Sequence, residues 1–393
     1  VTMQTLRNYV GGEWVASSSK EILDVKNPAT DEVIARVPLS RRQEVGETVS
    51  AAREAYEEWR ETPALTRVRY LFALKSVLED GFEEISRTLV REQGKCLDEA
   101  RGEVRRGIEC VEVAMGMPSL MMGHNLEDVA KDIDCVAVRQ PMGVFAMIPP
   151  FNFPAMVPLW FLPFAVACGN TFIVKPSEQV PMCQQLIFQA IDEVGFPPGV
   201  LNLVNGSRAV AEALIEHEDV TGISFVGSSP TAAYVYRKAA ERGKRVQALG
   251  GAKNFVVVMP DARLDRTVPA LLTSFFGCAG ERCLSGSVLV AVGDVYEPLR
   301  DRFVEEASRL RVGYGLEEGT QMGPLISRAH LERVLGYVER GLKEGAALIL
   351  DGRNVRVEGY PNGYFLGPTI FDDVTPEMSI AREEIFGPVV SII

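Results

Sequence analysis

Residues 143–175 read GVFAMIPPFNFPAMVPLWFLPFAVACGNTFIVK, and this stretch decides the fold. Two apolar runs of strand-like composition, 143–148 and 171–174, enclose a longer apolar segment. Residues 140–174 carry no Asp, Glu, Lys or Arg, but they include five prolines: Pro149, Pro150, Pro154, Pro158 and Pro163. These prolines divide the stretch into pieces too short to cross roughly 30 Å of hydrocarbon. We therefore interpret it as buried strand–helix–strand core rather than a membrane span.

The same alternation of strands and helices continues through the middle of the chain, which is typical of a parallel sheet wound with helices. The expected strands are 143–148, 171–174, 200–204, 222–226 and 245–249. The expected helices between them are 155–167, 180–193, 207–217 and 230–242. Right-handed crossovers would bring the loops that follow the strands to one edge of the sheet.

A second α/β pattern begins near Gly251 and predicts a separate domain. Its expected elements are strands over 254–259 and 287–292 and helices over 264–276 and 296–310. The N-terminal part predicts a polar hairpin over 10–15 and helices over 41–60 and 64–93. Residues 128–140 alternate in polarity and predict an extended arm that joins a neighbour's sheet.

Composition excludes several classes of protein. The 393 residues, 47% of them hydrophobic, are enough for two or more domains, and the net charge of −12 would repel nucleic acid and anionic lipid. Seven scattered cysteines and three distant histidines argue against a disulfide framework and against a metal site, and favour a reducing compartment, the cytoplasm. We expect no signal peptide, because charged residues interrupt the opening: Arg7, Glu13, Lys20 and Glu21.

Residues 276–283 read FGCAGERC and suggest a nucleophile at Cys283. A thiol after a Gly-containing turn keeps its backbone amide accessible, and the neighbouring Arg282 favours the thiolate. A cysteine in apolar surroundings more often packs in a core, and that interpretation stays open. Cys278 is the rival thiol, which we expect to be buried.

Three further motifs lie just after predicted strands. Asn152, held between aromatics and prolines, suits an oxyanion hole, although capping of the next helix is an alternative. Lys175 and Glu178 are placed to hold ribose hydroxyls, and Gly227-Ser228 opens a helix onto a phosphate, although a plain surface turn would look the same. Glu178 would repel a 2′-phosphate, which favours NAD over NADP.

Taken together, these motifs resemble the aldehyde dehydrogenase superfamily. Asn152 in PPFNFP, Lys175 in KPSE, Gly227, Cys283 in AGERC and Glu384 in EEIFGPV occur in the order of that family. The resemblance covers essentially the whole chain. It implies an α/β fold with a Rossmann-type NAD-binding domain, an α/β catalytic domain and an oligomerisation arm. The implied parts are 1–127 and 142–250 for NAD binding, 128–141 for the arm and 251–393 for catalysis.

The resemblance also implies roles for single residues. Cys283 would be the nucleophile and Asn152 would stabilise the thiohemiacetal oxyanion. Lys175 and Glu178 would hold the adenine ribose, and Gly227 and Ser228 would lie near the pyrophosphate. Glu384 and Phe386 would position the nicotinamide ribose, although from its neighbours alone Glu384 looks like a solvated acid.

One departure points to a subfamily. Hydrolytic members carry Glu in E-L-G-G, where it activates water, whereas this chain has Ala248-Leu249-Gly250-Gly251. The thiol of CoA has a pKa far below that of water and can attack the acyl group with less assistance from a base, so Ala248 favours acyl transfer to CoA. The alternatives are loss of activity, or Glu281 as a substitute base. The triplet Glu281-Arg282-Cys283 is similar to the CoA-acylating methylmalonate-semialdehyde dehydrogenases, which act on malonate or methylmalonate semialdehyde with NAD and CoA.

That subfamily implies a carboxylate-binding pocket and an oligomer. Arg106 and Arg282 match its carboxylate-binding positions, although Arg106 also fits a solvated helix face. A homodimer or homotetramer is implied where the family's full C-terminus is present. The sequence stops inside the family's catalytic domain. If the protein also ends there in solution, we expect an exposed sheet edge at 128–140 with weak activity and aggregation.

Overall fold

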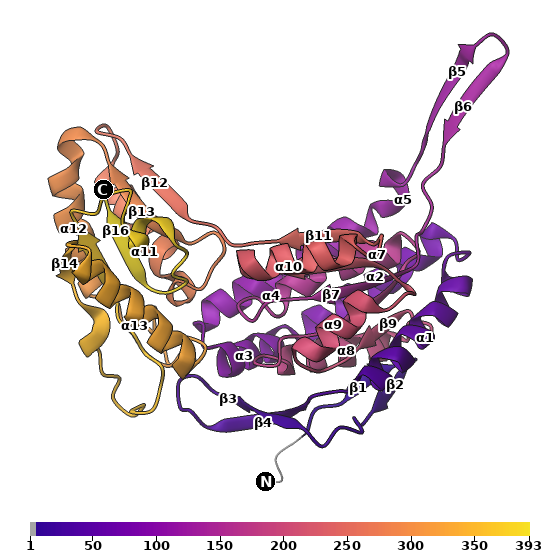
Figure 1. Cartoon of the computed structure of the whole chain (residues 1–393), viewed down its shortest axis with the longest axis horizontal. Helices are drawn as coiled ribbons and strands as arrows, with labels where there is room; N and C mark the ends of the chain where they lie inside the picture. The colour runs from indigo at the N-terminus through magenta and orange to yellow at the C-terminus, as the bar shows by residue number, and fades with distance from the viewer. Residues whose placement is uncertain (1–4) are drawn as a thin grey trace. The chain divides into compact units, whose positions relative to one another are not determined.

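The computed structural model describes residues 5–393, which form two compact units. Within the described residues the first unit comprises 5–25, 35–86 and 101–250. The second comprises 26–34, 87–100 and 251–393. Figure 1 shows the helices and strands of each unit. No helix of this described part is both long and apolar enough to cross a membrane.

A seven-stranded sheet forms the centre of the first unit, in the order β11-β10-β7-β8-β9-β1-β2. Its bounds are β11 Arg245–Leu249, β10 Val220–Val226, β7 Val144–Ile148, β8 Thr171–Val174, β9 Leu201–Leu203, β1 Asn8–Val10 and β2 Glu13–Val15. The first five strands are parallel, and β1 and β2 continue the sheet antiparallel. The predicted parallel sheet is therefore confirmed, because each of its five predicted strands forms.

The helices between residues 42 and 240 belong to the first unit, except that α3 and α4 each have residues in both units. Their bounds are α1 Arg42–Trp59, α2 Ala64–Asp80, α3 Phe82–Gln93, α4 Leu97–Met115, α5 Met117–Leu120, α6 Met156–Leu159, α7 Leu162–Ala167, α8 Met182–Val194, α9 Arg208–Glu216 and α10 Ser229–Ala240. Apolar side chains of α1, α9 and α10 pack with β7, β8 and β10 in one core, which includes Val49, Leu214, Val235, Val144 and Ile173. This packing keeps the strand ends in fixed positions.

Two helices predicted as continuous are each divided, so those predictions were wrong. The predicted helix 64–93 ends at Asp80 and restarts at Phe82, because Gly81 interrupts it. The predicted helix 155–167 breaks between Leu159 and Leu162, and Pro163 stands in the first turn of α7. Proline lacks the N–H that an interior helical position needs, so it favours a helix start.

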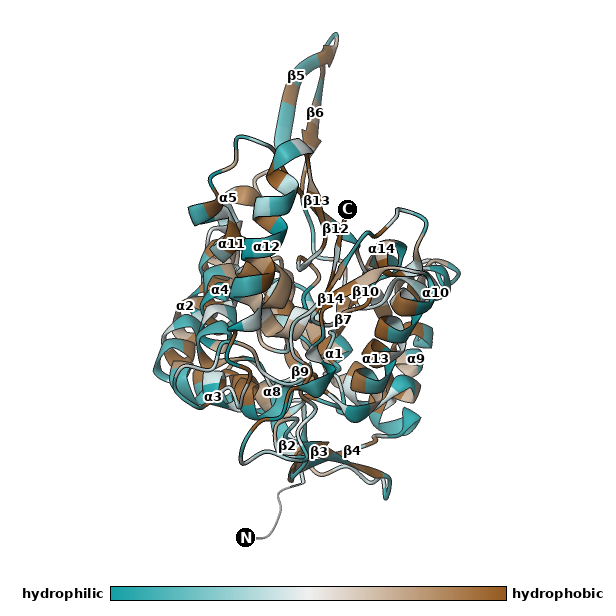
Figure 2. Ribbon diagram, turned by 90° about the vertical axis from the view of Figure 1, so that its left-hand side faces the viewer, coloured by the Kyte–Doolittle hydropathy of each residue, from teal (hydrophilic) through white to brown (hydrophobic). Residues whose placement is uncertain are grey.

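A two-stranded hairpin of β5 (His124–Ala130) and β6 (Ile133–Ala137) extends from the end of α5 (Figure 1). Both strands are exposed along their whole length. Apolar and polar residues alternate on it (Figure 2), and its exposed apolar side chains include Leu126, Val129, Ile133 and Val136. The hairpin begins four residues before the predicted arm. A second hairpin is formed by β3 (Ile22–Lys26) and β4 (Val33–Pro38).

The second unit is built on a five-stranded sheet in the order β12-β13-β16-β15-β14. Its bounds are β12 Asn254–Val258, β13 Gly286–Ala291, β16 Val389–Ile392, β15 Thr369–Asp372 and β14 Ala347–Leu350, and only β14 is antiparallel. The helices are α11 Leu264–Phe276, η1 Gly277–Gly280, η2 Gly293–Val295, α12 Tyr296–Ser308, α13 Arg328–Lys343, η3 Gly352–Asn354 and α14 Ser379–Arg382. The predicted strands and helices between 254 and 310 are confirmed.

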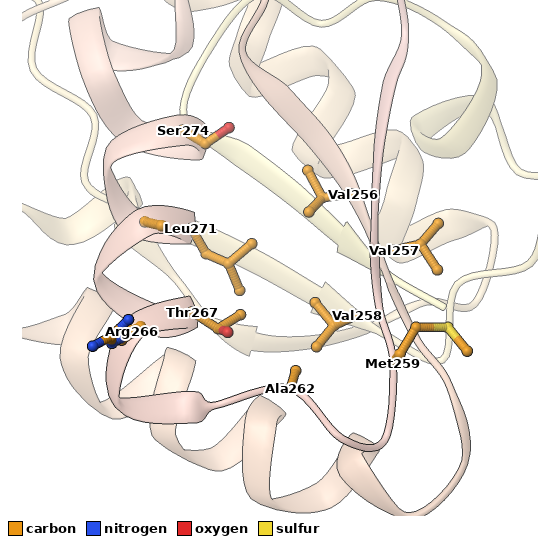
Figure 3. Close-up of a pocket in the computed structure, with 10 residues that line it drawn as sticks. Val256, Val257, Val258, Met259, Ala262, Arg266, Thr267, Leu271 and Ser274 are labelled. Carbon is orange, nitrogen blue, oxygen red and sulfur yellow. The ribbon is translucent and has the colours of Figure 1, made fainter.

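A cavity of about 570 Å³ lies between β12 and α11. Figure 3 shows Val256 and Val258 pointing toward Leu271 of α11, whereas Val257 and Met259 lie on the other side of the strand. Among the described residues, none of those predicted for catalysis or cofactor binding lines this cavity. The cavity is therefore separate from the predicted site residues.

Candidate active site

The carboxyl ends of three neighbouring strands carry the predicted site residues of the first unit. Strands β10, β7 and β8 are adjacent and parallel. Gly227 follows β10, Asn152 lies in the loop after β7, and Lys175 follows β8 directly. Because parallel strands end at the same edge of a sheet, the fold brings these three positions to one side, as the sequence predicted.

Asn152 is almost fully buried, with 1% of its surface exposed. The alternative interpretation made it the cap of the following helix. At that helix start, however, the backbone N–H groups of Ala155 and Met156 donate to Glu103 Oε1, at 2.8 and 3.2 Å. Glu103, which the sequence analysis did not single out, therefore serves the helix terminus.

Lys175 and Glu178 form a close pair, with 3.1 Å between Nζ and Oε2. The Lys175 side chain is 5% exposed and that of Glu178 is 32% exposed. Burial lowers the pKa of Lys175, and the neighbouring carboxylate of Glu178 opposes that shift. A buried donor next to a partly exposed acceptor is a suitable arrangement for ribose hydroxyls.

Gly227 and Ser228 lead into the N-terminus of α10. A Cβ atom on Gly227 would lie 2.5 Å from the Phe225 ring, so a larger residue here would require that ring to move. Ser228 is the exposed N-cap, and its hydroxyl lies 2.9 Å from that of Thr231. The first turn of α10 carries no acidic residue, so its N–H groups are compatible with an anion.

The nucleophile loop of the second unit begins with a tight turn. Cys278, Ala279 and Gly280 all have positive φ, at 49°, 52° and 74°. Cys283 follows and is half-buried. Its carbonyl and that of Ser285 both accept from Asn254 Nδ2, each at 2.8 Å. One amide side chain at the start of β12 therefore fixes the backbone on both sides of residue 284.

Arg282 does not point freely toward solvent. Its Nη2 lies 2.9 Å from Glu99 Oε1, and its Nε donates to Cys278 Sγ at 3.3 Å. Glu99 also accepts the N–H of Cys278 at 2.7 Å. Burial raises the pKa of the Cys278 thiol to about 12, so this rival thiol is the packed one, as predicted. A substrate carboxylate would have to compete with Glu99 for Arg282.

Glu384 and Phe386 lie in the segment that follows α14. Glu384 is half-buried and its Oε1 accepts the N–H of Ala252 at 3.2 Å, so it is not simply a solvated acid. Phe386 has a φ of 63°, a left-handed conformation that is rare outside glycine. Arg333 of α13 donates to the carbonyls of Ile385 and Glu384, at 2.7 and 3.0 Å.

The two predicted carboxylate-binding arginines differ in their surroundings. Arg106 is exposed on α4, and among residues 5–393 it has no hydrogen bond or ion pair. Its neighbour Arg105 instead pairs with Glu79, at 2.6 Å for the closest atoms. Arg106 thus has its guanidinium available for a ligand, whereas Arg282 is already engaged.

Four residues that shape the site were not predicted from the sequence: Glu99, Glu103, His330 and Arg333. Each acts on residues at least 50 positions away along the chain. A weak signal was present in the helix that starts at Leu97, where Glu99 and Glu103 stand one turn apart, and both serve backbone N–H groups of the loops.

Comparisons with known proteins identify the family. The model of the aldehyde dehydrogenase family matches residues 14–393. Malonate-semialdehyde dehydrogenase 3 of Geobacillus kaustophilus is 51% identical over 390 residues, which cover 99% of this chain and 80% of that protein. The methylmalonate-semialdehyde dehydrogenase of Oceanimonas doudoroffii (44% identical) and a Sinorhizobium meliloti structure in complex with NAD (40%) each have a TM-score of 0.97, covering 100% of this chain and 80% of theirs. The resemblance seen in the sequence is confirmed, and the chain belongs to the aldehyde dehydrogenase family.

Proposed function

We propose that this chain oxidises malonate or methylmalonate semialdehyde with NAD and transfers the acyl group to CoA, with loss of carbon dioxide. The observation that carries the proposal is Ala248, which stands where hydrolytic relatives have their general base, in a chain 51% identical to a malonate-semialdehyde dehydrogenase. The substrate class rests on the names of the relatives and on the arginines of the chain.

Several features of the chain are compatible with NAD. The Lys175–Glu178 pair would hold the adenine ribose, and the N-terminus of α10 at Gly227-Ser228 would receive the pyrophosphate. Glu384 and Phe386 would hold the nicotinamide ribose. A Cβ atom on Gly251 would lie 2.0 Å from the Glu384 carboxylate, so the bare backbone there leaves the carboxylate its space.

The chemistry of the chain's own residues then follows. The Cys283 sulfur bonds to the aldehyde carbon and loses its proton, and the Asn152 amide donates to the oxygen that becomes negative. NAD, when bound, supplies the acceptor for the hydride. The carbon left on Cys283 is a thioester, which the thiol of CoA attacks; a new carbon–sulfur bond forms and the Cys283 thiolate leaves. The bond between the α-carbon and the substrate carboxylate breaks, carbon dioxide leaves, and a proton from solvent is added to the α-carbon, so the product is acetyl-CoA or propionyl-CoA.

Glu281 is a poor substitute for the missing base. It is fully buried, and its two oxygens accept from Gln93 Nε2 and from the N–H of Ile326, each at 3.2 Å. A buried carboxyl group whose two oxygens are already hydrogen-bonded is poorly placed to activate a water. This supports the proposal that CoA, and not water, accepts the acyl group.

The exposed hairpin β5–β6 supports an oligomer. We propose that it joins the sheet of a second copy, because its alternating apolar residues are exposed on both strands. A homodimer or homotetramer would cover them. The seven free thiols fit the cytoplasm as the compartment.

The proposed acyl acceptor predicts that NADH formation depends on CoA. With methylmalonate semialdehyde and NAD but no CoA, we expect a burst of about one NADH per active site and then slow turnover, because the thioester waits for a thiol. Addition of CoA should restore continuous NADH formation and yield acyl-CoA, detected by mass spectrometry. Equal steady-state rates with and without CoA would contradict the proposal.

Installing the lost base is a sharper test. Ala248 lies on β11, the edge strand of the sheet, and is half-buried against the core. We expect Ala248→Glu to raise formation of the free acid, without CoA, about tenfold or more, since a positioned base typically contributes that much. Ala248→Gln is the matched control and should give no gain. A folded Ala248→Glu variant without extra hydrolysis would mean that another feature selects the acyl acceptor.

A further inference from the structure

Within the second unit, the nucleophile loop contacts Gly387, the residue that directly follows the Glu384–Phe386 segment. A Cβ atom on Gly280, which has a φ of 74°, would lie 2.3 Å from the carbonyl oxygen of Gly387. The two backbones therefore meet with no side chain between them. A displacement of the segment that would hold the nicotinamide ribose must therefore also displace the loop that carries Cys283.

Glu281 fixes the position of the nucleophile loop through its hydrogen bonds. It stands two residues before Cys283, is fully buried, and its own N–H donates to the Cys278 carbonyl at 2.9 Å. Its carboxyl oxygens are held by Gln93 and by the N–H of Ile326. Burial raises the pKa of Glu281 well above its ordinary range. The hydrogen bond from the Ile326 N–H and the positive charge of Lys95 lower this pKa, but burial has the larger effect. A carboxyl so placed fixes the loop instead of exchanging protons with substrate.

His330, in the first turn of α13, faces both parts. Its Nε2 lies 2.7 Å from the Phe386 carbonyl oxygen and 3.5 Å from Glu281 Oε1. Since a carbonyl only accepts, Nε2 carries the proton. Burial lowers the pKa of His330, and the positive charge of Arg333 lowers it further. The hydrogen bond to the Phe386 carbonyl raises this pKa and partly opposes the shift. The ring is thus a neutral donor placed between the loop and the strained residue.

The same helix holds the rest of the segment. Arg333, one turn after His330, takes the carbonyls of Ile385 and Glu384, so three successive carbonyls are bound from one helix face. The left-handed backbone of Phe386 persists only where its surroundings hold it. Of His330 and Arg333, His330 is therefore the residue that lies against both the Glu384–Phe386 segment and the side chain of Glu281.

We propose that Glu281 and His330 are positioning residues that couple the Cys283 loop to the Glu384–Phe386 segment, so that binding of NAD and the reactivity of Cys283 depend on each other. The proposal rests on the NAD-dependent function proposed above and deepens it. It assigns neither residue a contact with substrate. Thermodynamic linkage makes this coupling reciprocal. If NAD binding changes the conformation of the Cys283 loop, then a change in that loop also changes the affinity for NAD.

The test measures this coupling directly in the purified full chain. The rate of alkylation of Cys283 by iodoacetamide is followed by peptide mass spectrometry with and without saturating NAD, and the dissociation constant of NAD is measured by titration. Cys135, a thiol of the β5–β6 hairpin, is the internal control. Its rate should be the same with and without NAD, whether or not a second copy covers the hairpin. In the wild-type chain we expect NAD to change the Cys283 rate about fivefold or more.

The variants separate positioning from general damage. His330→Leu removes the donor, and we expect NAD affinity to fall about five- to tenfold, as for one lost hydrogen bond, and the effect of NAD on Cys283 to drop below about twofold. His330→Gln keeps an N–H donor and should restore most of both. Arg340→Gln, which removes a contact of the same helix with exposed Glu383, is the matched control and should leave the coupling unchanged.

Each outcome decides a different question. A wild-type chain that fails to bind NAD, or whose Cys283 is not alkylated, would overturn the proposed function. A normal wild type with full coupling retained in His330→Leu would overturn only the positioning pair. If His330→Leu does not fold, Glu281→Gln decides, because it is isosteric but cannot accept from both Gln93 and Ile326; retained coupling in that variant would also refute the proposal.

Discussion

Replacing Cys283 with serine is expected to lower kcat/KM for semialdehyde oxidation by about ten-thousandfold or more, the usual scale for loss of a nucleophile. A serine hydroxyl stays protonated at neutral pH, so it is a much weaker nucleophile than a thiolate. The measurement is NADH formation under single-turnover and steady-state conditions, because the burst itself should vanish. NAD affinity should stay within about threefold of the wild-type value, since the substitution changes one atom.

The matched controls use the other thiols. Cys135→Ser changes an exposed residue of β6 and should leave the rate unchanged. Cys278→Ser tests the rival thiol, which is buried against Arg282 and Glu99. We expect it to cost stability more than rate. A burst that survives in Cys283→Ser but disappears in Cys278→Ser would transfer the nucleophile to position 278.

The parallel sheet was predictable because its signals are local. The central strands β7 (VFAMI) and β8 (TFIV) are short apolar runs bounded by turn residues, and burial on both faces makes such runs nearly continuous. The Lys175–Glu178 pair was predictable for the same reason, since three residues separate its members. The breaks at Gly81 and Phe161 were missed, because apolar periodicity continues across them while the backbone does not.

The supporting contacts of the site were not predictable, because they join residues remote in sequence. Glu99 reaches Cys278 across 179 positions and Glu103 reaches Ala155 across 52. Nothing in LDEARGEV distinguishes these two acids from a solvated helix face until the fold buries one face of the helix. The same holds for Arg282, whose charge the sequence assigned to the thiolate of Cys283 and the structure places against Cys278 and Glu99.

The second large effect is expected at Asn152. Asn152→Ala should lower kcat about 10²- to 10³-fold, equivalent to roughly 3–4 kcal/mol of transition-state stabilisation, because one amide donor to the oxyanion is lost. The loss should fall on kcat and spare the affinity for NAD, since the ground state carries little charge on that oxygen. Pre-steady-state NADH formation measures the effect on the acylation step itself.

Asn152→Asp is the informative companion, because it preserves the size of the side chain and replaces the donating amide with an acceptor. An oxyanion donor predicts that the aspartate variant is at least as slow as the alanine variant, since a carboxylate would repel the developing charge. A purely structural asparagine predicts the opposite order, with the isosteric change better tolerated in a site only 1% exposed. Melting temperatures of both variants separate the cases: the helix start is held by Glu103, so loss of rate without loss of the fold assigns the amide of Asn152 to the chemistry.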